Sequence, residues 1–124
     1  MENENSWNVI LTERFETWLT HQDKSTRISV LTSLTNLQTF GPLLGRPYAD
    51  TIKGSLYPNM KELRIQHNGK PIRAFFAFDP LRQAIVLCAA DKSNDKLFYP
   101  KMLKIADSEF KKYLQNLCDN KDTK

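Results

Sequence analysis

Two arginines on neighbouring predicted strands are the residues of this sequence best suited to chemistry. The segments 60–67 and 71–79 alternate apolar and polar residues, and the Asn-Gly pair at 68–69 between them is a strong signal for a two-residue hairpin turn. In that register Arg64 lies directly opposite Arg73, and with a four-residue loop the two are diagonal neighbours on the same face. Like charges at opposed positions destabilise a sheet, so we expect the two guanidinium groups to hold an anion.

Further cations and aromatic rings fall on or near the same predicted face. Phe75 shares the face of Arg73 by alternation, with Val86 and Cys88 expected beside them, and Lys92 follows that strand with matching parity. Aromatic rings beside arginines are typical of single-stranded RNA binding, in which the rings stack on bases and the cations contact phosphates. The expected RNA contacts around the central cations are Lys53, Lys61, Phe75, Lys96 and Phe98.

Ordinary ion pairs give a second interpretation of the same charges. Arg64 could pair with Glu62 or Glu109, and Arg73 could pair with Asp91. In that case the charged face has a structural role. Both interpretations stay open at the level of the sequence.

The sequence contains no other catalytic motif. It has no phosphate-binding glycine loop, no nucleophile elbow and no His or Cys cluster with metal-ligand spacing, so we predict neither a metal nor another cofactor. The two histidines, His21 and His67, are more typical of surface residues than of a catalytic base. Cys88 and Cys118 lack ligand spacing, and we expect two free thiols in a reducing compartment.

The composition is that of a small globular protein. The 124 residues are 40% hydrophobic and 26% charged, with a net charge of +4 that points only weakly to a polyanionic partner. We expect a single domain over 1–124 with frayed ends at about 1–6 and 119–124. No apolar run approaches the length of a membrane span, and residues 1–6 lack the features of a secretory signal, so we expect a cytoplasmic protein.

The predicted elements follow the order β-α-α-β-β-β-β-α. A short strand at 7–11 precedes a helix capped by Thr12, and a second helix begins at Asp23 or Ser25 and ends at Gly41-Pro42. The short connection between these helices predicts an antiparallel helical hairpin. The apolar stripe expected along the second helix consists of Ile28, Leu31, Leu34 and Leu37.

The second half of the chain predicts most of the sheet. A short strand near 51–55 is followed by strands at 60–67, 71–79 and 83–90, and a helix spans 97–117 with a restart near Asp107. The order predicts an α+β fold: an N-terminal two-helix hairpin, an antiparallel sheet of about four to five strands with the helices mainly on one face, and a C-terminal helix.

A series of short motifs resembles the HigB-like toxins of the RelE/ParE superfamily. The motifs are Gly41-Pro-x-x-Gly-Arg-Pro47, Asp50-Thr-Ile-Lys-Gly54, Met60-Lys-Glu-Leu-Arg64, Pro71-Ile-Arg73, Phe76-Ala-Phe-Asp-Pro80, Asp91-Lys92 and Phe98-Tyr99. The resemblance covers residues 7–117. It implies a RelE-like fold and the toxin of a type II toxin–antitoxin system, a metal-independent endoribonuclease that cleaves messenger RNA, commonly on the ribosome. It also implies a HigA-like antitoxin with a helix-turn-helix domain.

The resemblance further implies roles for individual residues. Basic residues of the central strands polarise the scissile phosphate, and matched by position these are Arg64, Arg73 and Lys92. An aromatic residue near the last helix assists, which is Phe98 or Tyr99. Aligning Lys92 with the loop cation of the superfamily puts Phe98 in the aromatic position, whereas Tyr99 offers a proton donor. The superfamily also contains inhibitors of DNA gyrase, so a gyrase inhibitor and a non-catalytic RNA-binding module are the alternatives.

Overall fold

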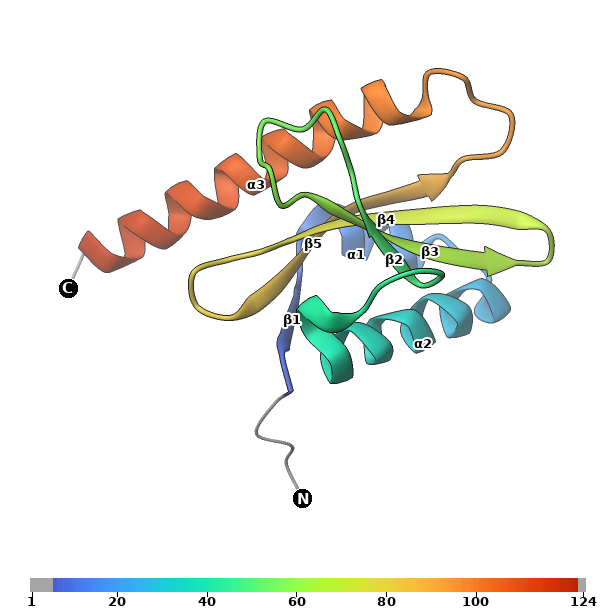
Figure 1. The fold of residues 1–124 in the computed structure, drawn as a ribbon, viewed down its shortest axis with the longest axis horizontal. Coiled ribbons are helices and arrows are strands. Elements are labelled where there is room, and N and C mark those ends of the chain that lie inside the picture. Colours follow the sequence, from blue (N-terminus) through green and yellow to red (C-terminus); the bar gives the residue numbers. More distant parts are fainter. Residues whose placement is uncertain (1–5, 123–124) are drawn as a thin grey trace.

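Five strands form one sheet in the computed structural model, which describes residues 6–122 (Figure 1). The strand order across the sheet is β1-β5-β4-β3-β2. The elements are β1 (Asn8–Leu11), α1 (Glu13–Thr20), α2 (Lys24–Phe40), the 3-10 helix η1 (Gly41–Leu43), β2 (Ala49–Thr51), β3 (Lys61–His67), β4 (Lys70–Phe78), β5 (Gln83–Asp91) and α3 (Phe98–Asp122). This is the predicted order, and the α+β class is confirmed.

The sheet is mixed, not purely antiparallel. Strands β2 to β5 are antiparallel to their neighbours, but β1 pairs with β5 in parallel. After β1 the chain passes through α1 and α2. It then rejoins the sheet at β2, the edge strand opposite β1. The Asn-Gly turn has the expected conformation, with φ of 49° at Asn68 and 78° at Gly69. The predicted register is confirmed, because Arg64 pairs with Arg73.

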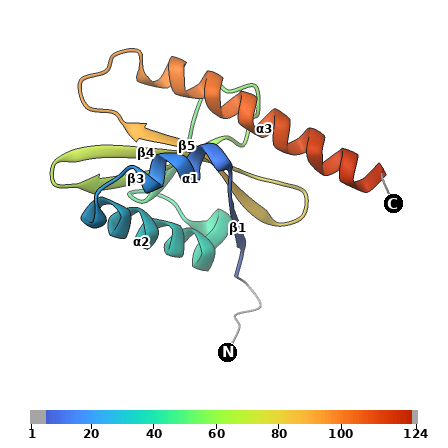
Figure 2. The same ribbon diagram turned by 180° about the vertical axis from the view of Figure 1, so that it is seen from behind.

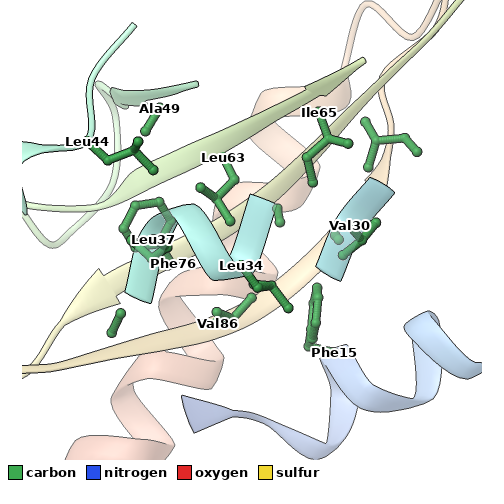
Figure 3. Close-up of a cluster of buried hydrophobic side chains, with 14 residues drawn as sticks. Phe15, Val30, Leu34, Leu37, Leu44, Ala49, Leu63, Ile65, Phe76 and Val86 are labelled. Atoms are coloured by element: carbon green, nitrogen blue, oxygen red, sulfur yellow. The ribbon is translucent and has the colours of Figure 1, made fainter. Parts of the chain in front are cut away.

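Helices cover both faces of the sheet, which corrects the expectation that they lie mainly on one. Helices α1 and α2 pack on one face and α3 packs on the other (Figures 1 and 2). The cause lies in β4, whose residues are apolar on both sides. Ala74 and Phe76 pack under the N-terminal helices, as Figure 3 shows for that core, whereas Phe75 and Ala77 pack under α3.

The N-terminal helices start where predicted, but the apolar stripe of α2 is only half correct. Thr12 caps α1 and Asp23 caps α2 by accepting hydrogen bonds from backbone amides. The buried residues of α2 are Thr26, Val30, Leu34 and Leu37. Ile28 and Leu31 point away from the core and are 54% and 48% exposed. Gly41 ends α2 with a φ of 52°, and a Cβ there would overlap the ring of Trp7.

Three predicted boundaries were wrong. Strand β2 lies at Ala49–Thr51 instead of 51–55. Helix α3 is continuous through Asp107 and reaches Asp122, so it does not restart and it ends later than residue 117. Asp107 instead accepts hydrogen bonds from the backbone amide of Leu56 and the hydroxyl of Ser55, which ties the β2–β3 loop to α3. The ends expected to fray at 1–5 and 123–124 lie outside the described residues. Within residues 6–122, no helix has the length and hydropathy needed to cross a membrane.

Alkaline pH should remove the stability that the contact between α3 and the β4–β5 turn contributes to the fold. The Tyr113 hydroxyl donates to Asp79 at 2.7 Å, and burial and this carboxylate raise the pKa of Tyr113 to about 12. Since the unfolded tyrosine ionises near pH 10, the contribution of Tyr113 to the free energy of unfolding is complete below pH 10 and lost as the pH rises towards 12. Urea unfolding measures the free energy of unfolding at pH 8 and at pH 11. Between these two pH values it should fall less for Tyr113→Phe than for the unmodified protein. Equal losses would contradict this prediction.

Candidate functional site

A buried carboxylate joins the predicted site residues. Glu62 is 4% exposed and accepts hydrogen bonds from Arg64 Nη1 at 2.9 Å and from the Tyr99 hydroxyl at 2.8 Å. The Nε of Arg73 lies 3.6 Å from the same Oε1 atom that accepts from Tyr99. The two strands and the first turn of α3 thus meet at one side chain. The sequence placed Glu62 on this face by parity, but not at its centre.

Arg73 lies beneath the surface. Its side chain is 4% exposed, and its Nη1 donates to the backbone oxygen of Ile72 at 3.1 Å and to Gln66 at 3.4 Å. Its Nε is buried without a hydrogen-bond partner. Arg64 is more accessible, with a side chain 23% exposed. Glu62 therefore neutralises much of the cationic charge expected here, and Arg64 is the guanidinium group that a bound anion can reach.

Tyr99 and two lysines form the solvent side of the site. Lys92 Nζ lies 5.7 Å from the centre of the Tyr99 ring, a cation–π distance. Lys96 lines the same surface hollow, of about 420 Å³, with Lys92 and Tyr99. Burial raises the pKa of Tyr99, and the hydrogen bond and charge of Glu62 raise it further. Tyr99 therefore stays protonated at neutral pH.

The ion-pair interpretation is correct in part. Arg64 pairs with Glu62, as one alternative held. Glu109 pairs instead with Arg14 and Lys112 on the surface. Arg73 faces Glu62 and not Asp91, whose carboxylate accepts hydrogen bonds from Ser93.

Two aromatic residues expected to stack on bases are buried. Phe75 is 0% exposed and Phe98 is 2% exposed, and both belong to the core under α3. This corrects their assignment as RNA contacts, because α3 covers the face that the sequence left open. Of the two neighbouring rings, that of Tyr99 contacts Glu62 and Lys92.

The remaining corrections concern the edges of the site. Lys61 pairs with Phe76, so its side chain leaves the sheet on the α2 side, where it donates to Thr51. Lys53 is exposed in the β2–β3 loop, and no contact places it at Glu62. A β-bulge at Phe75/Phe76 puts Val86 in the α2 core, although Cys88 keeps the expected face.

Other titratable groups have structural roles. Among the described residues, no group of three His, Cys, Asp or Glu side chains could hold a metal ion. Cys88 and Cys118 are free thiols, and burial raises the pKa of Cys88 to about 12. His67 shares hydrogen bonds with Ser25 and Ser29, which tie the end of β3 to α2.

This arrangement of sheet and helices is the fold of the RelE toxins. Two structures of Escherichia coli RelE, one of the isolated toxin and one of a double arginine-to-alanine mutant in the free state, each match with a TM-score of 0.57. They cover 81% and 76% of this chain, and the chain covers 99% and 92% of theirs. The sequence identities are 11% and 9%, so the likeness concerns the fold.

Sequence comparison identifies the family. Residues 17–111 match the family described as phage derived protein Gp49-like (DUF891), and the chain belongs to this family. Two candidate toxins of Mycobacterium tuberculosis (strain ATCC 25618 / H37Rv) are similar to it. HigB3 is 41% identical over 107 residues, which span 86% of this chain and 92% of HigB3. HigB2 is 40% identical over 111 residues, which span 88% of this chain but only 55% of HigB2. The chain is thus a HigB-like protein with the RelE fold.

Proposed function

We propose that this protein is the cytoplasmic toxin of a type II toxin–antitoxin pair and that it arrests growth by cleaving messenger RNA, on the ribosome. The observation that carries the proposal is that Arg64 and Tyr99 both contact the buried Glu62, with Lys92 over the ring of Tyr99. Each of the three is partly exposed, and together they offer a guanidinium group, an amine and a hydroxyl to one phosphate. The family relationship to proteins named as toxins supports the same class.

The proposed reaction is attack of a ribose 2′-hydroxyl on the adjacent phosphorus, without a metal ion. Arg64 stabilises the negative charge that develops on the phosphate oxygens, since a forked guanidinium can donate to two of them. Lys92 neutralises a second oxygen. The proton of the 2′-hydroxyl passes to solvent water as the bond to phosphorus forms. The Tyr99 hydroxyl, once it turns from Glu62, protonates the leaving 5′ oxygen, and the resulting tyrosinate regains a proton from water. A tyrosine with a raised pKa is a slow acid, so positioning of the RNA by the ribosome would supply much of the rate.

The proposed antitoxin is a HigA-like protein with a helix-turn-helix domain. Phe15 in α1 is 0% exposed and cannot anchor this partner, whereas Trp18 is partly exposed. The outer face of α2 offers Ile28 and Leu31 instead. We propose that the antitoxin contacts the helices in this region, because exposed apolar side chains suit a compact helical domain better than an acidic tail.

Induction of the gene followed by mapping of transcript 5′ ends tests the proposed function. We expect growth arrest, a stop in translation and new 5′ ends within coding sequences. Lys92→Ala, produced at the same level, should give far fewer ends, because it removes the cation that lies over the Tyr99 ring. Arrest with intact messages and damaged DNA would instead favour the gyrase inhibitor. RNA that is bound but not cut would favour the non-catalytic module.

A further inference from the structure

One donor of Arg73 has no acceptor. Among the side chains that the structure describes, its Nε is the single buried nitrogen or oxygen atom without a hydrogen-bond partner, and the side chain is only 4% exposed. A charged donor left unpaired in the interior destabilises a fold, and native structures contain few such atoms. The surroundings of this atom should therefore show what it can bind.

An acceptor lies just beyond bonding distance of this donor. Glu62 Oε1 is 3.6 Å from the Nε, whereas a hydrogen bond from a guanidinium group to a carboxylate is about 2.8 Å long. The same Oε1 atom accepts a hydrogen bond from the Tyr99 hydroxyl at 2.8 Å, and Oε2 accepts one from Arg64 at 2.9 Å. Movement of Arg73 by less than about 1 Å would close the contact.

Arg73 is held beside Glu62 but has little surface to offer a substrate. Its Nη1 donates to the backbone oxygen of Ile72 at 3.1 Å and to Gln66 at 3.4 Å, which keeps the guanidinium group next to the carboxylate. Direct contact with the scissile phosphate, the role that the family resemblance implied, requires an accessible guanidinium group. Arg64, with a side chain 23% exposed, meets that requirement and Arg73 does not.

The proposed reaction creates a need for this donor. Tyr99 has to turn its hydroxyl from Glu62 to protonate the leaving 5′ oxygen, and Oε1 then loses its short hydrogen bond. The tyrosinate that remains lies beside a carboxylate, and two like charges so close together in a partly buried site repel each other. The charge of Arg73 opposes this repulsion: burial and Glu62 raise the pKa of Tyr99, whereas Arg73 lowers it.

We propose that Arg73 is a positioning residue that acts through Tyr99 and not through the phosphate. As the Tyr99 hydroxyl turns away, the Nε of Arg73 closes on Oε1 of Glu62 and replaces the lost donor. The O–H bond of Tyr99 then breaks, its proton goes to the 5′ oxygen, and Arg73 faces the tyrosinate until water returns a proton. The proposal rests on the proposed ribonuclease function and assigns the step in which Arg73 takes part.

A double-mutant cycle separates action through Tyr99 from contact with the phosphate. Its readout is the rate at which purified protein, in excess, cuts one messenger RNA on ribosomes. We expect Arg73→Met to lower that rate about ten- to hundredfold, the effect of losing a hydrogen bond to a charged group. Added to Tyr99→Phe, however, Arg73→Met should change the rate by less than about twofold, because no hydroxyl remains to be released. Losses that multiply would show a direct contact and overturn the proposal.

Two further variants control for folding and for charge. Urea unfolding shows whether Arg73→Met folds. Should it not fold, Arg73→Lys, which keeps a cation beside Glu62, takes its place in the cycle with a smaller expected loss. Arg14→Met is the matched control, since Arg14 also pairs with a glutamate but is 52% exposed on the surface. It should leave the rate unchanged.

Titration of Tyr99 gives a readout that does not depend on cleavage. With Tyr99→Phe to assign the signal, ultraviolet titration should give a higher pKa for Tyr99 in Arg73→Met than in the unmodified protein or in Arg14→Met, because the positive charge beside the phenol is lost. If the unmodified protein cuts no RNA, the ribonuclease proposal fails, and the role of Arg73 fails with it. If it cuts, and the pKa of Tyr99 is unchanged in Arg73→Met, only the role of Arg73 is overturned.

Discussion

Arg64→Ala should abolish growth arrest and lower RNA cleavage by a factor of roughly 100 to 1,000, the usual effect of removing one donor to a developing oxyanion. Arg64 is the more accessible of the two opposed arginines, because its side chain is 23% exposed whereas that of Arg73 is 4% exposed. Arg64→Lys should retain part of the activity, since it keeps the charge and loses the fork. Mapped 5′ ends per unit of soluble protein provide the measurement.

Stability must be measured beside activity for Arg64→Ala. Two like charges at opposed positions, taken alone, predict that removing one leaves the melting temperature unchanged or raises it. The hydrogen bond from Arg64 to Glu62 changes that expectation to a loss of about 1–2 kcal/mol in the free energy of unfolding. Arg82→Ala is the matched control, because Arg82 stacks on Trp7 at the opposite end of the sheet. Arrest by Arg64→Ala as strong as that by Arg82→Ala would remove Arg64 from the mechanism.

The register of the central hairpin could be predicted from the sequence because it depends on local chemistry. An Asn-Gly turn fixes the pairing of the two strands, and alternation then decides which side chains share a face. Arg64, Arg73 and Glu62 were placed on one face in this way. Hairpin geometry was sufficient for these residues, since each lies within a few positions of the turn.

The packing of α3 over that face could not be predicted in the same way. Phe75 and Phe98 are apolar residues that suit either a core or a base-stacking surface, and only the packing of α3 decides between them. The β-bulge at Phe75/Phe76 has no sequence signal, and it moves Val86 to the opposite core. The packing of α3 therefore buries part of the face on which Arg64 and Arg73 lie, and these arginines form a network with Glu62.

Arg73→Ala, the obvious test of the original site, is ambiguous for this reason. Arg73 was expected to lie on an open face, where its removal would leave the fold intact. It is instead buried against Glu62, so its loss would leave that carboxylate with less positive charge around it. Loss of activity in Arg73→Ala could then follow from misfolding. The contribution of this network to stability is better measured by changing Glu62, the residue that accepts its hydrogen bonds.

Glu62→Gln should destabilise the protein more than any other charge change discussed above, by about 3 kcal/mol in the free energy of unfolding. The substitution keeps the shape of the side chain but leaves two adjacent guanidinium groups without their carboxylate, and breaking a buried ion pair by removing one partner is strongly destabilising. Glu109→Gln is the matched control. Its partners Arg14 and Lys112 are 52% and 66% exposed, so its loss should cost less than about 1 kcal/mol. Urea unfolding at pH 7 measures both values.

Two further measurements show whether Glu62 acts through the network. In the double variant Glu62→Gln, Arg73→Met, the buried charge and its partner are both removed, so the combined loss should be smaller than the sum of the two single losses. The pKa of Tyr99 should also fall in Glu62→Gln, since the hydrogen bond to the carboxylate and its negative charge both raise that pKa. Ultraviolet titration of tyrosinate, with Tyr99→Phe to assign the signal, detects the change. Additive losses and an unchanged Tyr99 titration would show that Glu62 does not couple the two arginines to the tyrosine.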